Sequence, residues 1–213
     1  MENNFFLDEL ISRYPQLLSL KEEINRAAAA LIKSYSQGSK VLICGNGGSC
    51  SDSDHIVGEL MKGFERKRRV TESFKSKLTE SAGERGAYLA EKLQQALPAI
   101  SLTAHSALIT AVANDTDANL IFAQQVAGYG KPGDVILGIS SSGNSQNVID
   151  ALITAKAMDL VVIGLTGETG GKMREFCDIL INVPGRRTAF VQELHLPVYH
   201  VLCLMVENHF FGN

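Results

Sequence analysis

Five short apolar runs recur along the chain, and most of them end in Gly or Ser. They are KVLICG (40–45), AISLTA (99–104), DVILGIS (134–140), LVVIGLTG (160–167) and DILINVPG (178–185). Each is rich in Val, Ile or Leu without alternation, which is typical of strands buried on both faces of a parallel sheet. Helix-length segments separate the runs, notably residues 144–157. This alternation predicts an α/β fold with a doubly wound, five-stranded parallel sheet and helices on both faces.

Long helices are predicted at both ends of the chain, which we treat as a single domain over residues 1–213. The N-terminal helical region, residues 1–37, contains Pro15, which predicts a break or bend. Residues 189–211 predict a largely apolar final helix with apolar side chains on more than one face. A helix of this kind needs a second partner, and the pattern therefore suggests a homo-oligomer.

The segment 65–97 interrupts the alternation of strands and helices. It is highly charged and has apolar residues at helical spacing, so we expect an inserted helical pair with a joint near Gly83–Gly86. The charges of Arg66–Arg69 have two interpretations. They form a solvated face, or they form a basic lip over an anionic substrate.

Composition narrows the classes of function. The 213 residues are 45% hydrophobic and carry a formal net charge of −3, which gives no general attraction to nucleic acid or to an anionic membrane. The first residues lack the blocks of a secretory signal, and no apolar stretch approaches the ~20 residues of a membrane span. We expect a cytoplasmic protein with a small-molecule or protein partner. The scattered cysteines are expected to be free thiols, with Cys44 and Cys203 in the core.

Two Gly- and Ser-rich turns follow predicted strands and precede predicted helices. In the first, Gly45-Asn46-Gly47-Gly48-Ser49, glycines allow close approach of the backbone to a ligand, and the helix-start N–H groups suit phosphate. The second, residues 138–145, offers the hydroxyls of Ser140, Ser141, Ser142 and Ser145. Ser142 or Asn144 could instead cap the following helix. Since such turns occur at two strand ends, we interpret their hydroxyls as phosphate ligands.

Two histidine-containing patterns suggest acid–base or metal chemistry. His55 and Glu59 are four residues apart, so a helix places them on one face, where they can meet a metal or share a proton. Alone, such a pair is usually a surface pair. Gln192, His195 and His200 lie on the apolar final helix, where a single histidine is more often a core residue. Gln192 and His200 are ~12 Å apart along a helix and ~80° around it. Their side chains can reach one common centre only if both bend towards it or if the two residues come from different subunits.

The phrases CGNGGS, HxxxE, AxxNDxxAN, GxSxSGNSxNV, GLTGxxGGKM and QExHxxxxH occur in this order. They resemble those of bacterial phosphoheptose isomerases, which are sugar isomerase (SIS) domain proteins with a flavodoxin-like fold. The similarity covers roughly residues 38–64 and 98–208.

The resemblance implies a role in heptose biosynthesis, the interconversion of sedoheptulose 7-phosphate and D-glycero-D-manno-heptose 7-phosphate or of a related ketose and aldose phosphate. It implies proton transfer through an enediolate by Glu59 and His200, assisted by Zn²⁺ on His55, Glu59, Gln192 and His200. It also implies a homotetramer with sites at subunit interfaces. The implied phosphosugar-binding residues are Asn46, Gly47, Gly48, Ser49, Asn114, Asp115, Ser140, Ser141, Ser142, Ser145 and Gln192.

The sequence departs from the family pattern at several places. Some members carry an arginine near the position of Gly63 and an aspartate at that of Ala189, and the insertion at 65–97 is outside the pattern. These departures leave the identity of the sugar open. A related factor of this fold binds the replication initiator protein and lacks the carboxylate of HxxxE and the last histidine. Glu59 and His200 are both present here, which favours the enzyme over such a regulator or over a phosphosugar-binding protein.

Overall fold

The structure is a computed structural model that describes residues 3–212. At its centre is a five-stranded parallel sheet in the order β2-β1-β3-β4-β5. This is the flavodoxin-like order of a doubly wound sheet. The five predicted strands are confirmed, with slightly shorter bounds: β1 Val41–Gly45, β2 Ala99–Ser101, β3 Val135–Ser140, β4 Val161–Thr166 and β5 Ile179–Asn182.

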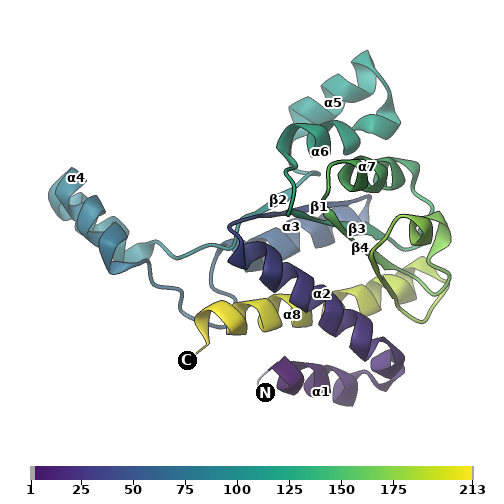
Figure 1. Ribbon diagram of the computed structural model, residues 1–213, viewed down its shortest axis with the longest axis horizontal. Helices are drawn as coiled ribbons and strands as arrows, with labels where there is room; N and C mark the ends of the chain where they lie inside the picture. The colour runs from purple at the N-terminus through teal and green to yellow at the C-terminus, as the bar shows by residue number, and fades with distance from the viewer. Residues whose placement is uncertain (1–2, 213) are drawn as a thin grey trace.

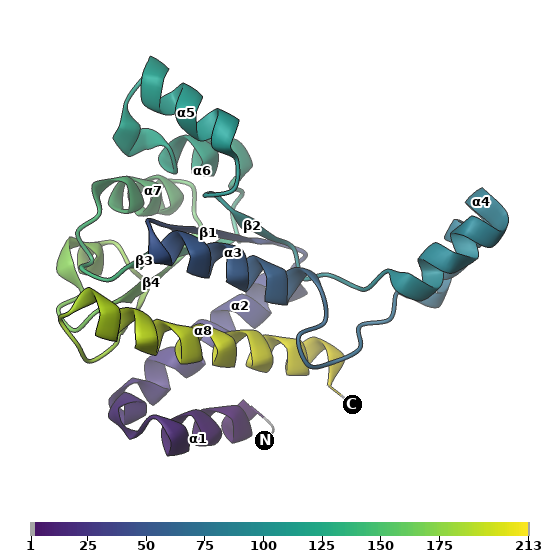
Figure 2. The ribbon, with the colours of Figure 1, turned by 180° about the vertical axis from the view of Figure 1, so that it is seen from behind.

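Helices cover both faces of the sheet (Figures 1 and 2). One face is covered by α1 (Asn3–Arg13), α2 (Lys21–Ser36), α3 (Gly48–Met61) and α8 (Thr188–Phe211). The other is covered by α6 (Ala123–Tyr129) and α7 (Gln146–Ala157), beside which lies α5 (Ser106–Asp115). Three short 3₁₀ helices complete the set: η1 Pro15–Leu20, η2 Ala118–Leu120 and η3 Gly171–Glu175.

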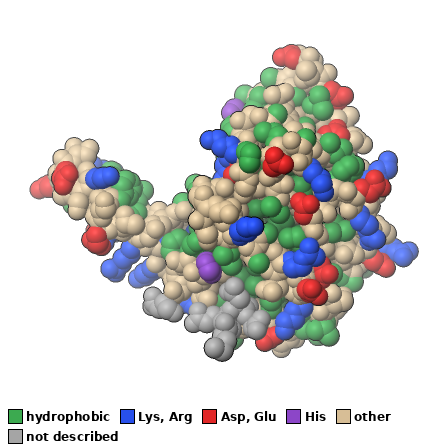
Figure 3. All heavy atoms as spheres, viewed as in Figure 1, with side chains coloured by type: hydrophobic (Ala, Val, Ile, Leu, Met, Phe, Trp, Pro, Cys, Tyr) green, Lys and Arg blue, Asp and Glu red, His purple; other side chains and the backbone are tan. Residues whose placement is uncertain are grey.

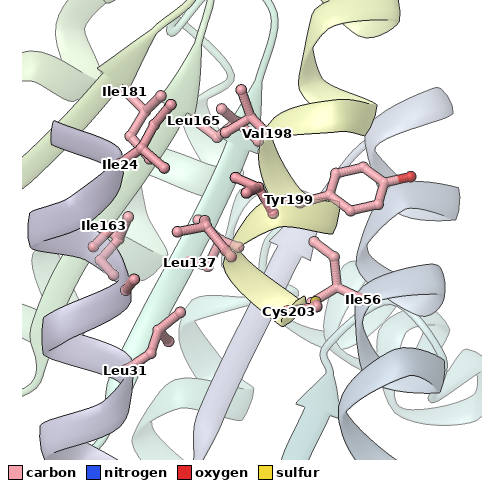
Figure 4. Close-up of a cluster of buried hydrophobic side chains, with 14 of the residues drawn as sticks. Ile24, Leu31, Ile56, Leu137, Ile163, Leu165, Ile181, Val198, Tyr199 and Cys203 are labelled. Atoms are coloured by element: carbon pink, nitrogen blue, oxygen red, sulfur yellow. The ribbon is translucent and has the colours of Figure 1, made fainter. Parts of the chain in front are cut away.

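Alternate residues of the strands supply two separate cores. In β1, Val41 and Ile43 belong to the core under α2 and α8, whereas Leu42 and Cys44 belong to the core under α6 and α7. All five residues of β1 are buried, which explains why the strand sequence shows no apolar–polar alternation. Figure 4 shows part of the first core, in which Leu137 of β3 lies among residues of α2 and α8.

The two long terminal helical regions form as expected. The first helix ends just before Pro15, as predicted, because proline disrupts a helix interior. The chain then turns through η1 into α2. By length and mean hydropathy (1.4), α8 would suffice for a membrane span, so the expectation that no apolar stretch approaches that length was wrong. Its most apolar window is 61% buried, and it packs beside α1, α2 and α3, as the core helix of a soluble protein does.

The insertion forms an arm that projects from the body of the molecule (Figures 1 and 2). Its helical part, α4 (Glu72–Lys92), contains non-helical residues at Ala82 and Gly83, and Gly83 has a φ of 53°. The expected helical pair with a joint near Gly83 is therefore confirmed. We use "the arm" for residues 65–97 below.

Candidate active site

The turn after β1 forms the first wall of the candidate site. In a sheet of this order, ligands bind where strand order reverses, between the carboxyl ends of β1 and β3. Gly47 has a φ of 58°, and α3 begins at Gly48 without a side-chain cap. A Cβ on Gly45 would lie 2.7 Å from the Cβ of Ser49, so glycine is required there. Ser49 is buried in the first turn of α3.

The turn after β3 forms the second wall. The hydroxyl of Ser140 lies 2.9 Å from that of Ser145. Ser145 is the N-cap residue of α7 and makes no side-chain capping bond. The alternative that Ser142 or Asn144 caps this helix is therefore wrong. The Ser142 hydroxyl instead accepts the backbone N–H of Asn144 within the turn. Ser141 is half-buried and Ser142 is exposed, so part of this turn is accessible to solvent.

A third turn, which follows β4, packs against the turn after β3, which we call the serine turn. A Cβ on Gly143 would lie 2.1 Å from the backbone oxygen of Gly170, so the two turns pack at backbone distance. The N–H of Lys172 donates to Asn144 Oδ1 at 3.0 Å, and that of Met173 donates to the oxygen of Gly143. The GLTGxxGGKM phrase therefore fixes the conformation of the serine turn.

Two asparagine side chains join the first and second walls. Asn46 Nδ2 donates to Asn147 Oδ1 at 2.9 Å, and Asn147 Nδ2 donates back to Asn46 Oδ1 at 3.0 Å. Asn147 is not among the site residues predicted from the sequence. In the sequence, Asn147 is marked only by its position in the phrase GxSxSGNSxNV. Its pairing with Asn46 is seen only in the tertiary structure. This amide pair holds the two turns at a fixed separation.

The candidate acid–base groups lie where α3 packs on α8. His55 Nε2 is 3.2 Å from Glu59 Oε1, and Lys62 Nζ is 3.0 Å from Glu59 Oε2. The His200 ring of α8 lies edge-on to the His55 ring with centroids 5.0 Å apart. Burial lowers the pKa of His200, and the neighbouring His55 acts in the same direction. The structure therefore brings His55, Glu59 and His200 close to one another.

A hydrogen-bonded chain that the sequence analysis missed extends from His55. The Tyr199 hydroxyl lies 3.0 Å from His55 Nδ1 and donates to Asp52 Oδ1 at 3.2 Å. Burial raises the pKa values of both Tyr199 and Asp52. Tyr199 directly precedes His200, and Asp52 lies three residues before His55. Neither is a specified position in the phrases on which the family resemblance depends.

The remaining candidates do not join this cluster. Gln192 lies at the first turn of α3, where a Cβ on Gly48 would be 2.4 Å from Gln192 Nε2. Asn114 and Asp115 lie exposed at the end of α5, and Asn114 Nδ2 donates to Asp115 Oδ1 at 2.8 Å. Among residues 3–212, no described hydrogen bond links any of these three to His55, Glu59 or His200.

His195, the other candidate core histidine of α8, is fully buried. Burial lowers its pKa to about 4, although the backbone of Thr166 acts in the opposite direction. It is a core residue, as its setting in the sequence suggested. The four cysteines are free, and Cys44 and Cys203 are buried, as expected.

The residues implied for zinc fit the ion in chemical type. Imidazole nitrogen and carboxylate oxygen are both zinc ligands, and His200 Nε2 is buried without a hydrogen-bond partner in the described structure. In the described part of the chain, however, no three His, Cys, Asp or Glu side chains already surround a metal position. The edge-on rings of His55 and His200 have to rotate before both nitrogens can face one ion.

Comparisons with known proteins agree with this geometry. The SIS domain family model matches residues 6–82 and 76–167. The chain is 38% identical over 195 residues to a phosphoheptose isomerase of Alteromonas mediterranea, covering 90% of this chain and 85% of that protein. It is 34% identical over 213 residues to that of Aneurinibacillus thermoaerophilus, covering 100% and 93%.

Solved structures show the same similarity. A phosphoheptose isomerase from Francisella tularensis has a TM-score of 0.76 at 32% identity, covering 97% of this chain and 96% of that one. The enzyme from Neisseria gonorrhoeae has a TM-score of 0.73 at 33% identity, covering 94% of both chains. By family model, sequence and structure, the chain belongs to the phosphoheptose isomerase family of SIS domain proteins.

Proposed function

We propose that the protein interconverts sedoheptulose 7-phosphate and D-glycero-D-manno-heptose 7-phosphate in the cytoplasm. The observation that carries this proposal is that one helix links both parts of the site. Helix α3 starts at the Gly- and Ser-rich wall and carries His55 and Glu59 farther along. Ser49 and His55 are six residues apart, roughly 9 Å along the helix axis, a span that an extended phosphosugar can bridge.

The neutral hydroxyl and amide groups of the two walls would hold the phosphate. Ser49, Ser140, Ser141, Ser142 and Ser145 offer hydroxyls, and the starts of α3 and α7 add backbone N–H groups. Phosphate at these helix starts is favoured by the helix dipoles. Asn114 and Asp115, exposed on α5, are proposed to contact sugar hydroxyls.

Ketose–aldose isomerisation moves a proton between adjacent carbons and another between oxygens. We assign the carbon proton to Glu59, a carboxylate held beside His55 and Lys62. His200, on the facing helix, would transfer the proton between the sugar oxygens. The apolar ring of Phe64, with its centroid 5.4 Å from that of His200, limits access of water to this side.

His55, Glu59, Gln192 and His200 are the residues we propose to hold Zn²⁺. When bound, the ion would supply positive charge beside the developing enediolate. Gln192, which lies against Gly48, has to reorient or to come from a second subunit. We accordingly propose a homotetramer with sites at subunit interfaces. Exposed apolar side chains on α8, including Phe190 and Leu196, support this assembly.

Turnover of sedoheptulose 7-phosphate by the wild type, Glu59→Gln and His200→Ala, with and without zinc, tests the proposal. Loss of an acid–base group lowers kcat roughly 10²–10⁴-fold. Glu22→Gln on the exposed surface of α2 is the control and retains wild-type activity. If zinc-loaded wild type turns over no ketose phosphate, the protein is not this enzyme.

A further inference from the structure

The arm has no core of its own. Its two helical segments, 72–81 and 84–92, are about ten residues each and join at Ala82–Gly83. Isolated helices shorter than about 12–15 residues are marginal in water. Only Gly86 and Ala90 are buried within α4. A Cβ on Gly86 would lie 1.8 Å from the Leu78 backbone oxygen, so the two segments meet at backbone distance at this point. The arm therefore needs another surface to be stable.

The base of the arm is held rigidly on the body. Glu207 of α8 is 1% exposed and accepts the backbone N–H groups of Phe64, Glu65 and Arg66 at 2.8, 2.8 and 3.2 Å. The same carboxylate pairs with Arg68 Nε at 2.8 Å, and Arg68 is also 1% exposed. These contacts fix the direction in which the arm leaves the body. The projection of the arm in Figures 1 and 2 therefore follows from its anchored base.

The surface of the arm is both apolar and basic. Phe74, Tyr88 and Leu93 are 44%, 48% and 42% exposed. Figure 3 shows hydrophobic and charged side chains mixed on this projection. A groove of about 660 Å³ separates α4 from the base. Its basic lining residues are Arg66, Lys67, Arg68, Arg69, Lys75 and Lys92.

The charge of the arm is opposite to that of the rest of the chain. Residues 65–97 contain eight Lys and Arg against five Asp and Glu, whereas the remainder contains twelve against eighteen. Two arms facing each other would bring like charges together. An arm facing the body of another copy would bring opposite charges together.

We propose that the arm docks on the acidic body of a second copy of this chain, and that the second copy returns its arm in the same way. Such reciprocal exchange is the isologous contact of a two-fold dimer, which can be repeated within a larger assembly. The side chains of Phe74, Tyr88 and Leu93 become buried there, and the basic groove faces carboxylates. This inference rests on the homo-oligomer proposed above and not on the isomerase reaction.

Two measurements on the full-length protein test the proposal. The double variant Phe74→Glu/Tyr88→Glu is compared with Ile153→Glu, whose parent side chain on α7 has a similar exposure of 42%. In sedimentation experiments over a range of concentrations, we expect the arm variant to raise the dissociation constant of the assembly at least tenfold over the control. Raised salt weakens the wild-type assembly as well, since it screens the opposite charges.

Hydrogen exchange of residues 72–92 then reports on the arm itself. We expect slow exchange in the assembled wild type and fast exchange, typical of short isolated helices, after dilution or in the arm variant. A wild type that stays monomeric, an assembly in which these amides exchange fast, or equal weakening by the arm and control variants overturns the proposal. Turnover is measured separately, so an inactive protein with a docked arm contradicts only the proposed reaction.

Discussion

The hydroxyl of Tyr199 fixes the tautomer of a proposed metal ligand. Its proton goes to Asp52 Oδ1, so its oxygen accepts the Nδ1–H of His55. The Nε2 of a neutral His55 then carries a lone pair, and it faces Glu59 Oε1 at 3.2 Å. Two lone-pair-bearing atoms at this distance repel each other unless a metal ion or a proton lies beside them. The arrangement favours cation binding.

Removal of this hydroxyl by Tyr199→Phe should weaken zinc binding. Loss of a partner that orients a metal-ligating histidine costs about 10–100-fold in metal affinity. The measurement is zinc competition with a chelator, which does not depend on turnover. Tyr35→Phe is a matched control, because the Tyr35 hydroxyl is buried and has no hydrogen-bond partner in the described structure. Equal zinc affinity in the two variants would contradict the role of Tyr199.

At the scale of elements, strands and helices could be predicted from local patterns, whereas the contacts between turns could not. Runs such as residues 135–139 specify their own strand because burial on both faces of the sheet favours apolar residues. Asn46 and Asn147 are 101 residues apart, and their pairing depends on β1 and β3 being neighbours in the sheet. No local pattern contains that adjacency. The same holds for Tyr199 and Asp52, which come from different helices.

The arm also explains a departure from the family pattern at Gly63. The N–H of Gly63 donates to Gln94 Oε1 at 2.8 Å, which joins the two ends of the arm. A Cβ at this position would lie 2.4 Å from the backbone oxygen of Arg66. An arginine at Gly63 is therefore incompatible with this turn.

The amide pair between the walls predicts a substrate-binding defect in Asn147→Ala. Without this side chain the two turns lose their fixed separation, and phosphate affinity falls. The loss of about 1.4 kcal/mol expected for such hydrogen bonds corresponds to a tenfold higher KM for the phosphosugar, with kcat changed less. Gln146→Ala, at the neighbouring exposed position, is the control. A KM for Asn147→Ala equal to that of this control would show that the pair does not shape the site.

The contact between α8 and the base of the arm predicts a large loss of stability in Glu207→Gln. The neutral amide leaves the buried Arg68 guanidinium without its counter-charge and removes an acceptor from the N–H groups of residues 64–66. Breaking a buried pair in this way costs about 3–5 kcal/mol. Denaturant unfolding measures it, with the exposed Glu65→Gln as control. A change below about 1 kcal/mol would mean that the pair is not the anchor.

At the scale of the whole molecule, α8 serves two purposes with one sequence. Val198 faces the sheet, while Tyr199 faces α3 (Figure 4), and the His200 ring lies against His55 of α3. This use of two faces explains why the helix is apolar almost all around. The site is therefore built on the most buried helix of the fold, and stability and site geometry are coupled.

The burial of His195 in α8 predicts a pH dependence of the free energy of unfolding. Its pKa is lowered to about 4 by burial, against about 6.5 when unfolded, so the unfolded chain binds more protons between these values. The contribution of His195 to the free energy of unfolding is therefore complete above pH 6.5. It falls by about 3 kcal/mol as the pH drops towards 4. Urea unfolding of wild type and His195→Gln at pH 7 and pH 4.5 isolates the contribution of His195, because the carboxylates titrate alike in the two proteins. The variant should lose less stability on acidification, and parallel losses would place the proton uptake elsewhere.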